Sequence, residues 1–337
     1  MRCNPTKMTA TSVAALLVMV AVGAAAGTVN GTASTQNAAI LAAEAWAFPQ
    51  QQSPDPNTPN ASAPKPNPHQ VVHVAGSTRA YTQAQIDNRI PDWFPQDHPP
   101  MPGIVAHGDK PAWACALCHN PDGRGGPATA ALTGLSEAYI LEQIAAFRSG
   151  DRGKGPWPTT QNMTKEALNA TDADLQQAAV YFSKLKFISQ TRVIETASVP
   201  KTHWEDYVLV PDNSGAREPI GERIVEIPVD FRLYQLSDEH SGYIAYVPPG
   251  SVARGAVIAT KGVGTAPSCE ACHGADLQGV GDIPPLAGRS PTYIVRELIL
   301  FRTGKRTNPE ALPMQREAAQ LTLKDMIDSA AYAASRQ

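Results

Sequence analysis

The sequence predicts a mainly α-helical fold in which one helical domain occurs twice in tandem and the two copies are joined by an insert rich in short strands. Three observations lead to this fold class. A motif of two cysteines and a histidine, at residues 115–119, recurs 154 residues later at residues 269–273. The same shift superimposes further flanking residues without a gap, which indicates that one structural unit is used twice. Between the copies, residues 188–250 alternate like short strands.

The flanking residues predict one long helix in each copy. The runs 139–147 and 293–301 place apolar side chains at helical spacing, and Gly150 and Gly304 follow where a helix would end. We expect both helices to belong to the cores of their domains. The residues matched by the shift include Gly108 and Gly262, Leu132 and Leu286, Gly134 and Gly288, Tyr139 and Tyr293, Phe147 and Phe301, and Arg148 and Arg302.

The repeated motif, C-x-x-C-H, is the attachment signature of c-type haem. Two thiols form thioether bonds to the porphyrin, and the adjacent histidine directs its imidazole at the iron. A zinc ribbon also pairs two C-x-x-C units, but only about 15 to 20 residues apart, and a thioredoxin-type pair needs one motif without a histidine. The sequence therefore predicts two covalently attached haem c groups, one on Cys115 and Cys118 and the other on Cys269 and Cys272.

A methionine follows each motif at a matched position. Beyond the predicted helix the register of the repeat becomes 151, which superimposes Met163 on Met314. We expect both in proline-containing loops, where a thioether suits a sixth iron ligand over the open face of a haem. The alternative for a methionine is a flexible core filler. We adopt that alternative for Met326, which aligns with Leu175 on the predicted terminal helix.

Taken together, these residues resemble a class I cytochrome c domain that has been duplicated, and the arrangement is similar to the two-domain dihaem cytochrome c4 group. The resemblance covers about residues 103–187 and 251–336. It rests on C-x-x-C-H, on Leu-x-Gly before a helix that starts with tyrosine and ends Phe-Arg-x-Gly, on the matched methionine, and on a final helix with its tyrosine.

The resemblance implies the iron ligands and one supporting contact. The implied axial ligands are the proximal histidines His119 and His273 and the distal methionines Met163 and Met314. In this family a proline carbonyl accepts a hydrogen bond from the proximal imidazole, which implies that role for the second copy's Pro284. In the first copy, Ala130 stands at the corresponding position.

The N-terminus has the organisation of a secretory signal. Arg2 and Lys7 precede an uncharged apolar run at residues 13–26. A helix of about 14 residues would be only about 21 Å long, which is short for a bilayer, so a cleaved signal is favoured over an uncleaved anchor. Export agrees with the periplasmic location that the family resemblance implies. Membrane attachment is then possible only through residues 8–27.

Composition divides the rest of the chain. The expected organisation is a signal peptide or anchor at 1–26, a tether rich in proline and asparagine at 27–70, a first cytochrome c domain with an N-terminal extension at 71–187, an acidic β-rich insert at 188–250, and a second cytochrome c domain at 251–337. We expect the tether to stay unordered because it buries little apolar surface. The extension, residues 71–102, is expected to lie irregularly on the first domain.

The insert carries 5 basic and 10 acidic residues, a net charge of −5, which fits either a solvated brace between the domains or a surface for docking a partner. Asp238, Glu239 and His240 are consecutive metal-binding residue types, but a turn with ordinary surface charges is the preferred interpretation. Strands are expected at 208–210, 223–229, 231–236 and 243–247.

The expected function is electron transfer by a carrier that is not itself an enzyme. Histidine and methionine together saturate an iron, so no substrate can coordinate it. The donor would be a quinol-oxidising complex or a dehydrogenase, and the acceptor a terminal oxidase or reductase of a respiratory chain. The nearly balanced charge of −3 does not indicate nucleic acid. Two alternatives stay open: a dihaem enzyme of peroxidase or thiosulfate-oxidising type, and a cytochrome subunit of a larger dehydrogenase.

Overall fold

The computed structural model describes residues 26–50, 67–88 and 91–336. Helices make up 43% of the described residues and strands 13%, which confirms the mainly α-helical class. The predicted signal lies outside the described residues apart from its last position. Across the described ranges, no helix is both long enough and apolar enough for a membrane span.

The first helical domain is built around the first motif. Its helices are α3 (Gly103–Ala106), α4 (Ala116–His119), α5 (Glu137–Ser149), α6 (Pro158–Asn169) and α7 (Asp172–Ser183). The hydroxyl of Ser136 caps α5, and Gly150 ends it in the left-handed conformation at φ +77°. Thr171 and Asp174 form a capping box at the start of α7. These ends fix the helices whose apolar faces form the domain core, with Ile140, Phe147, Leu175 and Phe182 among its members.

The second domain repeats the first one around the second motif. Its elements are α9 (Ser251–Lys261), α10 (Glu270–His273), the 3₁₀ turn η2 (Ala275–Leu277), α11 (Pro291–Arg302), the 3₁₀ turn η3 (Pro309–Ala311), α12 (Leu312–Gln320) and α13 (Leu323–Ser335). Helices α10, α11 and α13 repeat α4, α5 and α7 along the sequence. The long helices predicted at 139–147 and 293–301 are confirmed by α5 and α11.

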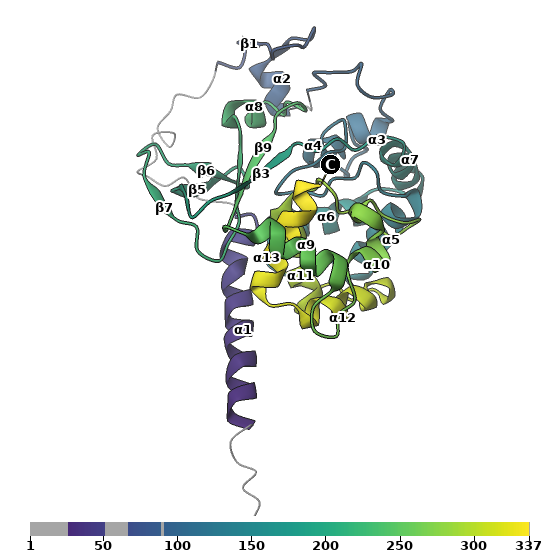
Figure 1. The fold of residues 1–337 in the computed structure, drawn as a ribbon. Helices are drawn as coiled ribbons and strands as arrows, with labels where there is room; N and C mark the ends of the chain where they lie inside the picture. Colours follow the sequence, from purple (N-terminus) through teal and green to yellow (C-terminus); the bar gives the residue numbers. More distant parts are fainter. Residues whose placement is uncertain (1–25, 51–66, 89–90, 337) are drawn as a thin grey trace, which may run out of the picture.

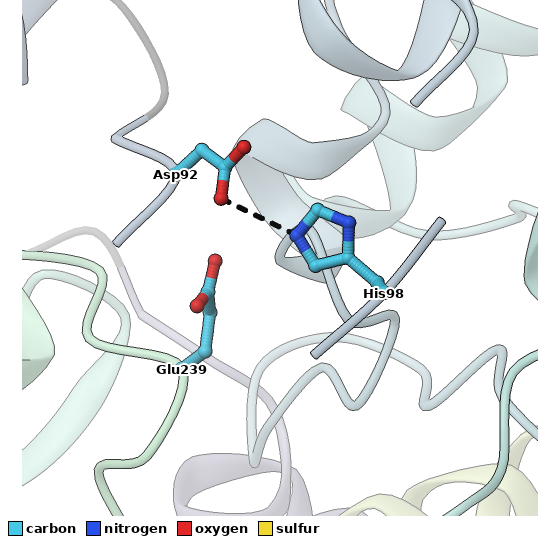
Figure 2. A group of neighbouring side chains, drawn as sticks. All are labelled: Asp92, His98 and Glu239. Carbon is cyan, nitrogen blue, oxygen red and sulfur yellow. Dashed lines mark ion pairs between the residues drawn. The ribbon is translucent and has the colours of Figure 1, made fainter. Parts of the chain in front are cut away.

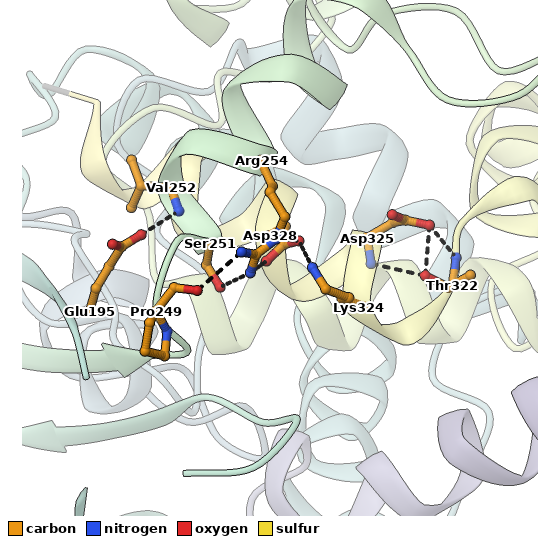
Figure 3. A network of polar contacts seen from close by, with 9 residues as sticks. All are labelled: Glu195, Pro249, Ser251, Val252, Arg254, Thr322, Lys324, Asp325 and Asp328. Carbon is orange, nitrogen blue, oxygen red and sulfur yellow. Dashed lines mark hydrogen bonds and ion pairs between the residues drawn. The ribbon is translucent and has the colours of Figure 1, made fainter. Parts of the chain in front are cut away.

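Helices α9 and α13 make the closest packing contact of the second domain. At Gly255 on α9, an added Cβ atom would lie 1.9 Å from the main-chain oxygen of Asp328 on α13. Beside this contact, Arg254 donates from Nε and Nη2 to the two carboxylate oxygens of Asp328, at 2.7 and 2.9 Å. Lys324 donates to the same carboxylate at 2.6 Å. Figure 3 shows this network spanning the two helices.

The insert is strand-rich, as expected, and its largest sheet has three strands. The strands are β3 (Thr191–Glu195), β4 (Ser198–Pro200), β5 (Thr202–Glu205), β6 (Val208–Pro211), β7 (Arg217–Pro219), β8 (Val225–Pro228) and β9 (Tyr243–Val247). In the main sheet, β9 lies between a parallel β3 and an antiparallel β8. Glu226 of β8 accepts hydrogen bonds from Ser290 and from the backbone N–H of Thr292 at the start of α11. The sheet is thereby joined to the second domain.

One predicted strand of the insert is wrong. Residues 231–236 contain helix α8 (Phe231–Gln235) because the carboxylate of Asp230 caps it, accepting from the backbone N–H groups of Arg232 and Leu233. The other three predictions are confirmed, since β6, β8 and β9 overlap the expected ranges.

The N-terminal extension contains β1 (Val71–Val72), β2 (Tyr81–Thr82) and α2 (Gln83–Asn88). The expected position on the first domain holds for its end, where Met101 packs against that domain's core, but the extension's own small core is shared with the insert. Trp93 and Phe94 are fully buried there with Leu236, and the indole N–H of Trp93 donates to the carbonyl of Leu236 at 2.8 Å. The extension and the insert therefore form one packed unit.

The prediction of a tether from residue 27 is wrong for residues 27–47, which form helix α1 (Ala26–Ala47). In Figure 1 its N-terminal part extends away from the body of the molecule. Its C-terminal end is apolar enough to pack, and Ala47 and Phe48 are fully buried. Phe48 stacks on Trp157 of the first domain at 3.9 Å, while Ala47 accepts a hydrogen bond from Arg296 of the second. Residues 51–66 of the expected tether lie outside the described residues.

The α9–α13 contact gives a stability prediction. Glycine to alanine inside a helix ordinarily stabilises by about 1 kcal/mol. At Gly255 the added methyl group meets backbone that has no room to move, so Gly255→Ala is expected to lower the free energy of unfolding by about 1 to 3 kcal/mol. Urea denaturation followed by circular dichroism measures the difference.

The matched control is Gly103→Ala at the start of α3, where nothing lies within 4 Å of the added Cβ atom. This substitution is expected to change the free energy of unfolding by no more than about 0.5 kcal/mol. A stabilised Gly255→Ala variant would contradict the close packing of α9 on α13.

Candidate haem sites

Each C-x-x-C-H motif forms a single helical turn. Cys115 precedes α4 and Cys269 precedes α10, while the second cysteine and the histidine lie within the turn. Positions three apart on a helix lie on the same side, so the two sulfurs of each motif can reach one porphyrin edge. All four cysteines are free of disulfide bonds.

Both motif histidines are oriented by a main-chain carbonyl. Nδ1 of His119 lies 2.8 Å from the carbonyl oxygen of Ala130, and Nδ1 of His273 lies 2.8 Å from that of Pro284. With Nδ1–H donating, Nε2 keeps its lone pair for a metal. Burial also lowers the pKa of both imidazoles, which favours the neutral form that binds iron. Alanine serves as well as proline here because the acceptor belongs to the backbone.

The two matched methionines lie on helices, so the prediction of loops is wrong for both. Met163 is on α6 and Met314 on α12. Pro158 and Pro313 occupy the first turns of these helices, where proline needs no hydrogen-bonded N–H and its fixed φ favours the helix. Both methionines are partly buried against the core of their own domain.

One cavity of about 1250 Å³ brings the candidate residues of both copies together. Its walls include all the predicted site residues, namely Cys115, Cys118, His119 and Met163 from the first domain and Cys269, Cys272, His273 and Met314 from the second. The α5 and α11 residues Ile144, Phe147, Leu298 and Phe301 supply apolar lining. An apolar lining of this kind suits a flat, largely hydrophobic ring system.

The domain interface is reciprocal. Arg152 of the first domain donates to the hydroxyl of Tyr293 at 3.0 Å and lies 3.1 Å from the carboxylate of Glu297. Arg306 of the second domain donates to the hydroxyl of Tyr139 at 3.0 Å. The shift of 154 that relates the motifs also relates Tyr139 to Tyr293 and Arg152 to Arg306. In each copy, therefore, an arginine at the matched position donates a hydrogen bond to the matched tyrosine of the other copy.

The carboxylate of Glu297 joins the two halves of this interface. It accepts from Arg306 at 2.7 Å as well as lying beside Arg152. Burial by itself raises the pKa of Glu297, but the charges of Arg152, Arg306 and Arg296 outweigh it and lower the pKa to about 2. The first domain has Gln143 at the matched position, and its amide oxygen accepts from both Arg152 and Arg306, at 3.1 and 2.6 Å.

The haem groups that the motifs imply carry carboxylates, and buried positive charge at the cavity fits them. Arg152, Arg289, Arg296 and Arg306 are all buried and line the cavity. Arg289 donates to the main-chain carbonyls of the first domain's residues 131 and 133, at 2.7 Å each. Burial lowers the pKa of Arg289 to about 10, as expected for a cation without a carboxylate close by. Anionic haem propionates would compensate this excess of positive charge.

The sequence did not single out the four arginines. Their role depends on how the two domains face each other, which no local pattern reports. One signal was present, because the repeat register aligns Arg152 with Arg306 and Gln143 with Glu297. Polar residues that repeat at core positions of a helical domain indicate a buried polar interface.

Two C-x-x-C-H turns with oriented histidines and matched methionines on one cavity define a dihaem c-type cytochrome. No family model matches the sequence. Cytochrome c4 of Pseudomonas aeruginosa is 26% identical over 234 residues, which is 68% of this chain and 87% of that protein. Cytochrome c-554(548) of Halomonas halodenitrificans is 39% identical over 71 residues, 21% of this chain and 86% of that protein. The thiosulfate dehydrogenase electron acceptor of Thiomonas intermedia is 25% identical over 224 residues, 66% of this chain and 77% of that protein.

The chain therefore belongs to the c-type cytochromes, and it is a dihaem protein of the cytochrome c4 type. It carries two covalently attached haem c groups and takes part in electron transfer.

The interface carboxylate gives a prediction with a defined pH dependence. Glu297→Gln leaves Arg152 and Arg306 without their shared buried anion and is expected to lower the free energy of unfolding at pH 7 by about 3 kcal/mol. The folded-state pKa lies below the unfolded value of about 4.3, so the advantage of the wild type is fully present above pH 5 and is lost as the pH falls toward 2. Urea denaturation at pH 7 and pH 3 measures both effects.

The control is Glu222→Gln on the exposed surface of the insert, for which we expect a change within about 0.5 kcal/mol. If the Glu297→Gln variant were destabilised equally at both pH values, the ion pairs would not be the cause.

Proposed function

We propose that the protein is a periplasmic electron carrier in which each iron has one histidine and one methionine ligand. His119 and Met163 would serve the first haem, and His273 and Met314 the second. The observation that supports this most directly is the cavity, whose walls contain both matched pairs. Each imidazole is also held by a main-chain carbonyl that leaves its Nε2 free.

The proposed ligands suit a carrier better than an enzyme. When bound, each haem supplies a one-electron ferric and ferrous couple. Imidazole and thioether would fill both axial positions, which leaves no site for substrate. The thioether favours the ferrous state and raises the reduction potential, and so does an apolar surrounding such as that of Phe147 and Phe301. The buried arginines would neutralise the negative charge of the propionates and fix the position of one domain relative to the other.

The two sites share one cavity, which supports electron passage between them within a single chain. We infer a protein that accepts electrons from a quinol-oxidising complex or a dehydrogenase and passes them to a terminal oxidase or reductase. A dehydrogenase donor is supported by the relative from Thiomonas intermedia, which is named as the electron acceptor of thiosulfate dehydrogenase. Export would follow from the predicted signal.

Carbon monoxide separates a carrier from a dihaem enzyme. It binds ferrous haem only where an axial position is open or easily vacated. The reduced protein is therefore expected to keep its Soret absorption unchanged under carbon monoxide. Rapid binding of one equivalent per chain would mean that one haem lacks its sixth ligand, and would favour the enzyme instead.

The methionines are tested one at a time. Met163→Ala and Met314→Ala are each expected to abolish the sulfur-to-iron charge-transfer band of one ferric haem and to lower its reduction potential, because the thioether is lost. Visible spectroscopy and a redox titration measure the two effects.

Met326→Leu is the matched control, because Met326 is fully buried in the core of the second domain. Its spectrum is expected to equal that of the wild type. If neither alanine variant changes the spectrum, the proposed distal ligands are wrong.

A further inference from the structure

A second group of metal-binding side chains lies away from the haem cavity. Asp92 and His98 come from the N-terminal extension, and Glu239 comes from the insert after α8. One ligand atom from each lies within 4.8 Å of the others. Figure 2 shows the three side chains converging on a common point. None of the three lines the haem cavity.

The buried carboxylate of Glu239 has no hydrogen-bond partner within the described part of the chain. The residue is 1% exposed, and neither of its carboxylate oxygens is hydrogen-bonded. The expectation of an ordinary surface charge at this turn is therefore wrong for Glu239. A buried carboxylate left unpaired is costly by several kcal/mol, so it requires a cation or a proton.

The other two residues are also short of partners. His98 Nε2 and Asp92 Oδ1 are 3.3 Å apart, an ion-pair distance, but they are not aligned for a hydrogen bond. The other ring nitrogen of His98, Nδ1, lies 2.9 Å from the carbonyl oxygen of Pro99. Donation from Nδ1 to a main-chain carbonyl is the arrangement that orients metal-binding histidines, because it leaves Nε2 as the metal ligand.

We propose that Asp92, His98 and Glu239 bind one divalent transition-metal ion, and that Zn²⁺ is the ion they suit best. One imidazole nitrogen and two carboxylate oxygens are ligands that zinc accepts, with water completing a tetrahedral set. The absence of a thiolate or thioether among the three disfavours Cu⁺. Calcium would demand six or more oxygen ligands, and here an imidazole takes one of only three protein positions.

One further carboxylate lies close to the site. Asp122, three residues after the first haem motif, is buried and pairs with Arg124. The metal would tie the extension to the insert close to the first domain.

The test uses the purified dihaem protein after treatment with EDTA. Isothermal titration with zinc chloride at pH 8 is expected to show one ion bound per chain. Glu239→Gln and Asp92→Asn should each weaken zinc binding at least about tenfold, since each replaces an anionic ligand with a neutral amide. Thermal unfolding should show that zinc stabilises the wild type.

Asp97→Asn is the matched control, because Asp97 lies on the same extension but pairs with His240 outside the group. It should bind zinc like the wild type. Failure of the wild type to bind zinc would overturn the proposal. So would a Glu239→Gln variant that binds zinc as tightly as the wild type, because the ion would then lie elsewhere. Displacement of zinc by equimolar calcium would overturn the choice of metal. None of these outcomes bears on the haem ligands.

Discussion

The arrangement of this molecule depends on a buried carboxylate held by two arginines from different domains. Glu297 lies 3.1 Å from Arg152 and 2.7 Å from Arg306, and all three side chains lie at the contact between the domains. Removing such a group from water is costly, so the contact is favourable only when every partner is present. This requirement selects one relative placement of the domains. That placement is also what makes the two candidate haem sites open into a single cavity.

The segments outside the two domains reinforce the same placement. Helix α1 ends against both domains, through Phe48 stacked on Trp157 and through the hydrogen bond from Arg296 to Ala47. The insert uses Glu226 to cap α11, a favourable position for a carboxylate because helix N-termini carry partial positive charge. The N-terminal extension is packed on the insert by Trp93. The segments before and between the two domains therefore help to hold the domains together.

The sequence was most informative where chemistry fixes the spacing of residues. Thioether attachment requires C-x-x-C-H, so the four cysteines and both histidines could be named at once, and the repeat register located the methionines. The local structure around Met163 and Met314 differs from the loops that nearby prolines predict, because proline at the first turn of a helix is favourable. Residues 231–235 form a helix and not the predicted strand, since the capping role of Asp230 outweighs β-type composition. The burial of Glu239 and the arginine interface depend on packing between segments far apart in the sequence, which hydrophobic periodicity cannot predict.

The two histidine contacts bear on how such a duplicated chain can diverge. In one half the imidazole is held by the carbonyl of Ala130, and in the other by that of Pro284. Because every residue type offers the same carbonyl, side-chain drift at these positions leaves the ring orientation intact. The halves are therefore free to become unlike in their surroundings, as Gln143 and Glu297 already are, while each keeps its imidazole fixed. Two domains that arose from one ancestral domain can in this way acquire different haem surroundings while both keep the orientation of the motif histidine.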